Sequence, residues 1–236
     1  MKKIYISLVV ITILVAFVSK MLIINNPSSN IYSACTYYQI VEASDSLPVY
    51  SLNVANEDYG DTLLSEKDNI IKKISGETIL NHGEVNIMVV RTQNNYSQLL
   101  QSYTQNAIIK EIISGDEKLK GNEITVVSYY GVFPNDNNQF CFWGTRGRNI
   151  MIPDNDYLIF CEKVETSDYY SIPMYRILPT TFSCLNLNSD YSKIVDINNN
   201  YYKEYIGSEF FVNNKKTLDA VLEIKHEIID SFYARK

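Results

Sequence analysis

The sequence predicts a mainly β fold with flanking helices (α+β), in which a small barrel or sandwich carries an amphipathic helix at its C-terminal end. Three observations lead to this prediction. Between residues 47 and 187, short runs of β-branched and aromatic residues alternate with clusters of Gly, Asn, Asp and Pro. Residues 214–233 repeat apolar side chains at helical spacing. Residues 1–24 are an apolar run with a positively charged start, which predicts one N-terminal transmembrane or signal helix.

The N-terminal segment predicts a membrane anchor. Lys2 and Lys3 precede the apolar run, and the positive-inside rule keeps both in the cytoplasm while the rest of the chain crosses. Residues 4–24 make about 31 Å of helix, which matches the roughly 30 Å hydrocarbon core of a bilayer. The alternative is a secretion signal that is cleaved, although no small-residue cleavage site closely follows the apolar core. We expect residues 25–34 to be a linker and residues 35–236 to form one extracytoplasmic β-rich domain.

The predicted extracytoplasmic part is acidic. The whole chain has 21 basic and 27 acidic residues, and residues 1–30 contribute three lysines and no acid, which leaves a net charge of −9 on the remainder. Such a surface repels nucleic acid and the anionic polymers of a cell wall. We therefore expect no nucleic-acid partner.

Four cysteines lie beyond the membrane segment, at positions 35, 141, 161 and 184. Outside the cytoplasm an even number permits disulfides, and several connectivities are open. The spacing includes no Cys-x-x-Cys, so neither a zinc site nor a redox motif is predicted. The first candidate pairing is Cys141 with Cys161, because two predicted strands carry them.

The expected strands are short and follow one another between turn residues. In chain order they cover residues 47–54, 85–92, 104–113, 123–132, 140–143, 157–161, 172–178 and 182–187. The segment from Gly115 to Gly121 (GDEKLKG) is typical of a hairpin turn. It lacks the Gly-Lys-Ser/Thr ending of a phosphate-binding loop.

Two helices are expected to bracket the strands. The first follows the cap-like sequence Ser65-Glu66-Lys67-Asp68, carries isoleucines at 70, 71 and 74, and ends near Gly76. The second runs from Asn214 to about Tyr233, and its broad apolar face predicts that it packs on the domain.

Four pieces of the middle region together resemble a known family. They are Ala107–Ile113, Gly115–Gly121, Ile124–Val126 (ITV) and Asp156–Phe160 (DYLIF). In this order they resemble small extracytoplasmic OB-type barrels, of which the netrin/TIMP-like modules are the nearest. The resemblance covers less than half of the chain, and it implies an OB-like barrel but no functional residue. Asp154 or Asn155 stands where the family has a Gly, and Cys35 has no nearby partner cysteine.

No complete catalytic motif is present in the sequence. His226-Glu227-Ile228-Ile229-Asp230 approaches the His-Glu-x-x-His motif of metalloproteases, but Asp230 stands where the second His is needed. We interpret it as part of a solvated acidic helix face. Neither His82 nor His226 lies near a nucleophile elbow, so no Ser-His-Asp triad is predicted.

Calcium is the metal that the loops come nearest to predicting. Asp136 and the stretch Asp154-Asn155-Asp156 offer oxygen ligands, but without the spacing of an EF-hand. Asn and Asp are also frequent in turns without a metal, because their side chains form hydrogen bonds with the nearby backbone. We therefore expect neither a metal nor a cofactor.

A recognition surface is the remaining candidate site. The chain has 19 tyrosines, several of them in pairs, and on a strand one ring of a pair faces inward and the other outward. Trp143, Arg146 and Arg148 lie together in the segment FWGTRGR, and Trp, Tyr and Arg dominate binding hot spots. These three residues are the candidate binding residues. The simpler interpretation is that tyrosine is frequent because it favours strands.

The sequence thus predicts a single-pass cell-membrane protein whose C-terminal domain is an extracytoplasmic, non-enzymatic binding or interaction module. Its partner is an unknown protein or envelope component, and the N-terminal helix holds it in the membrane. If the signal is cleaved, the protein is secreted. The alternative function is an extracytoplasmic hydrolase acting on wall or protein substrates. A pocket lined by His82 or acidic residues would favour the hydrolase, and a flat face bearing Trp143 and exposed tyrosines would favour the binding module.

Overall fold

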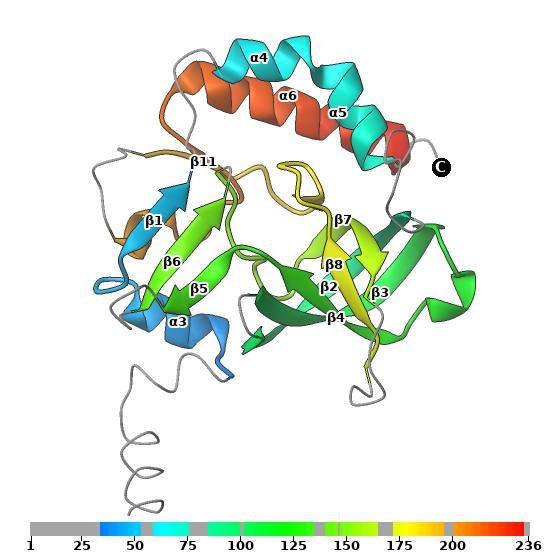
Figure 1. Cartoon of the computed structure of the whole chain (residues 1–236), viewed down its shortest axis with the longest axis horizontal. Helices are drawn as coiled ribbons and strands as arrows, with labels where there is room; N and C mark the ends of the chain where they lie inside the picture. Colours follow the sequence, from blue (N-terminus) through cyan, green and yellow to red (C-terminus); the bar gives the residue numbers. More distant parts are fainter. Residues whose placement is uncertain are drawn as a thin grey trace, which may run out of the picture.

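The computed structural model describes residues 34–52, 59–75, 85–99, 102–134, 140–145, 147–164, 172–195 and 201–233. The predicted fold class is confirmed: a small five-stranded barrel is joined by short additional sheets and a C-terminal helix (Figure 1). Within these ranges no helix is long and apolar enough to span a membrane. The predicted anchor, residues 1–24, lies outside them.

The barrel is closed by five strands. In order around the barrel they are β2 (Val85–Leu99), β3 (Ser102–Ser114), β4 (Glu123–Ser128), β8 (Met174–Ile177) and β7 (Asp156–Lys163). Strand β7 pairs back with β2, and every neighbouring pair is antiparallel except β4 and β8, which are parallel. Strand β9 (Cys184–Asn186) extends the sheet beyond β7. This arrangement is consistent with an OB-like barrel.

Strand β2 is buried on both of its faces at its N-terminal half. Met88 and Val90 belong to the cluster that fills the barrel, whereas Ile87 and Val89 belong to the cluster beneath the helices. Successive side chains of a strand point to opposite faces, so a strand covered on both faces is apolar without alternation. Strand β7 follows the same rule, and this explains the continuous apolar runs in both sequences.

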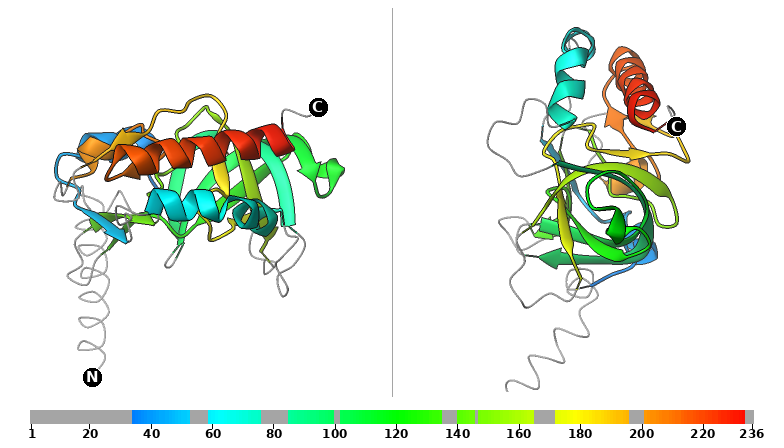
Figure 2. Two further views of the ribbon diagram at one scale, coloured as in Figure 1. Left: turned by 90° about the horizontal axis from the view of Figure 1, so that it is seen from above. Right: turned by 90° about the vertical axis from the view of Figure 1, so that its right-hand side faces the viewer.

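The helices α4 (Tyr59–Ser65), α5 (Lys67–Ile74) and α6 (Lys215–Phe232) form a layer over this face of the barrel (Figures 1 and 2). Helix α6 begins after Asn214, whose side chain accepts a hydrogen bond from the backbone N–H of Thr217 at 2.8 Å. Val221, Ile224 and Ile228 bury its apolar face. The predicted C-terminal helix and its packing on the domain are confirmed.

The predicted N-terminal cap at Ser65 is wrong. Ser65 ends α4, and its hydroxyl donates to the carbonyl oxygen of Thr62 at 2.9 Å. Helix α5 begins after Glu66, which makes no side-chain cap hydrogen bond. Helix α4 was not predicted, although it is nearly as long as α5.

A second, three-stranded sheet lies beside the barrel (Figure 1). Its strands are β1 (Val49–Leu52), β6 (Phe140–Thr145) and β5 (Gly131–Pro134), with β1 parallel and β5 antiparallel to the central β6. Helix α3 (Tyr37–Ala43) and the 3-10 helix η2 (Tyr202–Tyr205) pack with it around the aromatic residues Phe142 and Phe211. Strand β10 (Lys193–Ile194) pairs in parallel with β11 (Phe211–Val212).

The predicted strand 123–132 is two strands in two different sheets. Strand β4 ends at Ser128 in the barrel, and β5 begins at Gly131 in the three-stranded sheet. Gly131 has a φ of 151°, and a side-chain carbon there would collide with the ring of Tyr103. The chain therefore leaves the barrel at Tyr129-Tyr130, and this break creates one wall of the candidate site.

Candidate functional site

Two of the three predicted binding residues, Trp143 and Arg148, are described by the structure, and they lie in different surroundings. Trp143 is half-buried on β6, its indole N–H donates to the sulfur of Cys141 at 2.7 Å, and its ring stacks on Tyr50 with 6.1 Å between centroids. Arg148 is buried, with 4% of its surface exposed, and it contacts a different part of the molecule. Arg146 lies outside the described residues.

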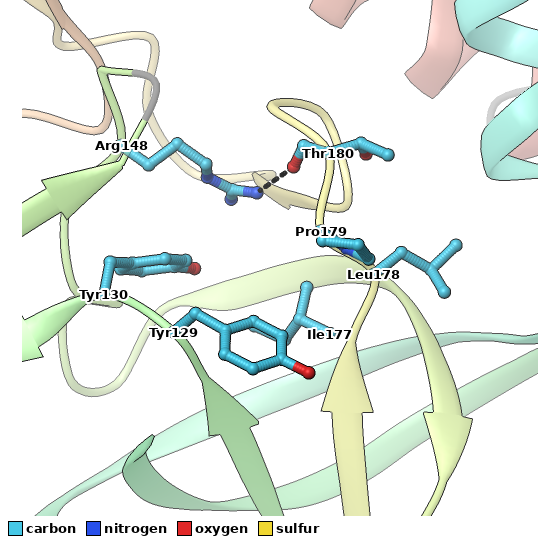
Figure 3. Close-up of a pocket in the computed structure, with 7 residues that line it drawn as sticks. All are labelled: Tyr129, Tyr130, Arg148, Ile177, Leu178, Pro179 and Thr180. Carbon is cyan, nitrogen blue, oxygen red and sulfur yellow. Dashed lines mark hydrogen bonds between the residues drawn. The ribbon is translucent and has the colours of Figure 1, made fainter. Parts of the chain in front are cut away.

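Arg148 lies in the wall of a cavity of about 300 Å³ at one end of the barrel (Figure 3). We call this cavity the Tyr–Arg pocket. Its lining residues are Tyr129, Tyr130, Arg148, Ile177, Leu178, Pro179 and Thr180.

The parallel pairing of β4 and β8 brings two walls of the pocket together. Val127 on β4 is in register with Arg176 on β8. Because both strands run in the same direction, the residues that follow them emerge at the same edge of the barrel. Tyr129-Tyr130 and Pro179 therefore lie on opposite sides of the cavity, while the side chain of Leu178 points away from it, as Figure 3 shows.

The third wall comes from the connection between β6 and β7. Arg148 forms an isolated antiparallel bridge with Phe210, and the preceding Gly147 has a φ of 73°, which favours glycine. The N–H of Asn149 donates to the carbonyl oxygen of Glu209 at 3.2 Å. These backbone contacts fix the chain where the arginine side chain enters the barrel end.

The guanidinium of Arg148 is held by groups from the connection between β8 and β9. One terminal nitrogen donates to the carbonyl oxygen of Thr180 at 3.4 Å and to the hydroxyl of Ser183 at 3.2 Å. The other donates to the carbonyl oxygen of Cys184. The guanidinium also lies 5.3 Å from the centre of the Tyr130 ring, which is within the range of a cation–π interaction.

The positive charge of Arg148 has no direct counterion among the described residues. The nearby buried acid is Glu209, but its two carboxylate oxygens accept from the backbone N–H of Asn186 at 2.7 Å and from the ammonium of Lys225 at 2.6 Å. The Nε–H of Arg148 has no acceptor in the part of the chain that the structure describes. An arginine stays protonated under all ordinary conditions, so the pocket carries a buried cation.

Aromatic rings form the floor and the mouth of the pocket. Tyr130 is buried, and burial raises the pKa of its hydroxyl, so that the group stays neutral. Tyr129 is 45% exposed, and the guanidinium of Arg176 lies 5.8 Å from the centre of its ring. Among the described residues that line the cavity there is no acidic side chain.

The four cysteines are buried free thiols in this structure. Cys141 lies on β6 in the three-stranded sheet and Cys161 on β7 in the barrel, so the structure does not bring the predicted disulfide partners together. Burial raises the pKa of Cys35 and of Cys184 to about 11, and it also raises the pKa of the other two thiols. Neutral thiols of this kind are poor nucleophiles.

The histidine motif on α6 makes surface ion pairs. His226 contacts the carboxylate of Asp190 at 3.0 Å, and Glu227 pairs with Lys67 at 2.6 Å. Where the structure is described, no three His, Cys, Asp or Glu side chains are placed to hold a metal ion. His82 and Asp136 lie outside that part of the chain.

Arg148 was identified from the sequence, and Tyr129-Tyr130 is one of the tyrosine pairs noted there, but the other residues of the pocket were not predicted. One local signal was available for Tyr129-Tyr130, because the glycine that follows the pair is typical of a break in a strand. No local signal was available for Ile177–Thr180, which reach the pocket only through the pairing of β8 with β4.

Comparison with known proteins adds no assignment to this geometry. No protein-family model matches the chain, and no curated protein matches it either. The functional inference therefore depends on the barrel and the Tyr–Arg pocket themselves.

Proposed function

We propose that this protein is a membrane-anchored, extracytoplasmic binding module that recognises its partner through the Tyr–Arg pocket. The pocket is the observation that carries the proposal. It combines two tyrosine rings, an apolar wall and one buried arginine, which are the groups that dominate recognition sites. Neither a histidine, a cysteine nor a carboxylate is among its described lining residues, which offer contacts for binding rather than a nucleophile with its base.

The location of the protein in the cell is part of the same proposal. The apolar N-terminal segment supports a single-pass membrane anchor, with the folded part on the outer side and a protein or envelope component as its partner. The five-stranded barrel supports the likeness to extracytoplasmic OB-type modules of the netrin/TIMP-like kind. Since the folded part is acidic, nucleic acid is not the proposed partner.

Site-specific crosslinking in intact cells tests the proposal. A photoreactive phenylalanine placed at Tyr129, at the mouth of the pocket, is expected to capture one reproducible partner. The matched control carries the same group at Tyr38, a tyrosine on α3 that is 68% exposed. Capture from position 129 and not from position 38 supports recognition at the pocket. Equal capture from both positions, or none from either, contradicts it.

A further inference from the structure

We infer that the Tyr–Arg pocket binds a carboxylate attached to an apolar group. This inference rests on the proposed function, because it names the ligand of the same pocket. A small organic acid and the C-terminal carboxylate of a peptide share this chemistry.

The charge of the site indicates an anion. Arg148 is 4% exposed, both carboxylate oxygens of Glu209 bond to other groups, and the described lining residues include no acid. A buried charge is expensive unless it is paired. Arg148 is compensated only by the partial charges of the oxygens that hold it and by attraction from Glu209, which makes no hydrogen bond with it. A ligand anion beside the guanidinium would complete the pairing in a setting where the attraction is much stronger than in water.

The hydrogen-bonding capacity of the site indicates a singly charged anion rather than a phosphate. Three acceptors from the protein use three of the five N–H donors of Arg148, two on one terminal nitrogen and one on the other. Of the remaining two donors, the Nε–H is buried and has no partner in the described structure. A phosphate carries more charge and three strong acceptor oxygens, and it requires several donors or cations. One partly occupied guanidinium suits a carboxylate, which forms charge-assisted hydrogen bonds with arginine.

The shape of the site indicates an apolar body of limited size. Ile177 lies beside the ring of Tyr129 and Pro179 lies across the cavity from Tyr130, whereas the side chain of Leu178 points away, into the cluster beneath the helices (Figure 3). The volume of about 300 Å³ lies at the lower end of the range for small-molecule sites. One aromatic ring or branched aliphatic chain with a short link to its carboxylate would fill this space.

Titration of the full-length protein in lipid nanodiscs tests the ligand class with defined probes. The first pair is 3-phenylpropionate and its neutral amide, and the second is a tripeptide ending in phenylalanine with either a free or an amidated C-terminus. We expect both acids to bind saturably. Both amides should bind at least about tenfold more weakly, because a hydrogen bond to a charged group is lost. The Nε–H resonance of Arg148 should shift only with the acids.

The variants are chosen so that a folding defect does not decide the result. Tyr129→Ala changes an exposed side chain at the mouth and should weaken binding of either acid about fivefold through lost ring contact. Tyr38→Ala removes a more exposed tyrosine ring on α3, away from the pocket, and should leave affinity unchanged. Equal binding of acid and amide, or equal effects of the two variants, would overturn the inference.

The outcomes also separate this inference from the proposed function. If the crosslinker at position 129 captures a partner while no acid binds, the ligand class is wrong and the binding function stands. If neither occurs, both fail. If the peptide acid binds at least about tenfold more tightly than 3-phenylpropionate, the carboxylate is a polypeptide end, and otherwise it is a free organic acid.

Discussion

Three buried ionisable side chains, Arg148, Glu209 and Lys225, differ in how their charges are balanced. Lys225 on α6 is fully buried and contacts both Glu209 at 2.6 Å and Asp190 at 2.8 Å. Burial raises the pKa of Glu209, and the ammonium of Lys225 offsets part of this rise. Lys225 and Glu209 therefore form a structural pair that fastens α6 to the segment before β11. Among the described residues Arg148 makes no direct ion pair, and Glu209 attracts its charge without a hydrogen bond between them.

Removing the ammonium of Lys225 should destabilise the protein strongly. We expect Lys225→Met to lower the free energy of unfolding by about 3–5 kcal/mol, because it leaves the carboxylate of Glu209 buried without a cation. Urea unfolding followed by circular dichroism measures the change. Lys67→Met, which removes a surface partner of Glu227, is the control and should destabilise the protein far less, because water screens this ion pair. Equal losses in the two variants would contradict the assignment of a buried pair.

The cysteines give a second prediction at this scale. Folded protein should not react with a maleimide at neutral pH, because all four thiols are buried and burial raises the pKa of Cys35 and Cys184 to about 11. After unfolding without a reductant, mass spectrometry should show four added groups. A count of two or none would instead indicate disulfides, as the sequence alone suggested for Cys141 and Cys161.

At the scale of elements, the connection between β4 and β5 determines the geometry of the pocket. The break after Ser128 places Tyr129 and Tyr130 at the barrel end, where they meet the residues that follow β8. Gly131 makes the break possible, since it combines a positive φ with a close approach to the ring of Tyr103. The geometry of the site thus depends on a residue that does not line it.

A side chain at position 131 should destabilise the protein. We expect Gly131→Ala to lower the free energy of unfolding by about 2–4 kcal/mol, from the strained φ together with the collision against Tyr103. Gly121→Ala is the matched control: its φ is 85° and open space surrounds it, so only about 1–2 kcal/mol of strain is expected. Thermal unfolding of both variants measures the difference. If Gly131→Ala were no worse than Gly121→Ala, the collision would not matter.

Some elements defined by a continuous stretch of sequence were predicted correctly. Features that depend on how distant strands pair were not predicted. Helix α6 was predicted with its cap because Asn214 and the apolar spacing lie in one continuous segment. The strands β2 and β7 were predicted because both of their faces are buried. The pocket was not predicted, since Tyr129 and Leu178 meet only through the register of β4 with β8. Arg148 was identified by residue type, but the sequence placed it on a surface, whereas its backbone bridge to Phe210 carries it inward.

At the scale of the whole molecule, the proposed topology makes a direct prediction. Protease added to intact cells should remove the chain beyond residue 30, because the positive-inside rule leaves only the N-terminal tip in the cytoplasm. Immunoblotting against a C-terminal tag measures the loss, and a cytoplasmic protein that stays intact is the control. Degradation that requires lysis would place the folded part on the inner side and would remove the basis for an extracytoplasmic partner.

The pairing of early with late segments has a consequence for biogenesis. Strand β1 joins its sheet only beside β6, and the carbonyl oxygen of Leu47 accepts a hydrogen bond from the N–H of Tyr202, far along the chain. Contacts of such long sequence separation slow folding, because a large loop must close before they form. Strand β1 and the residues around Leu47 therefore stay unpaired until β6 and Tyr202 are available. During this interval their exposed aromatic residues are prone to aggregate. A chaperone that binds the emerging chain would therefore have its greatest effect on these segments.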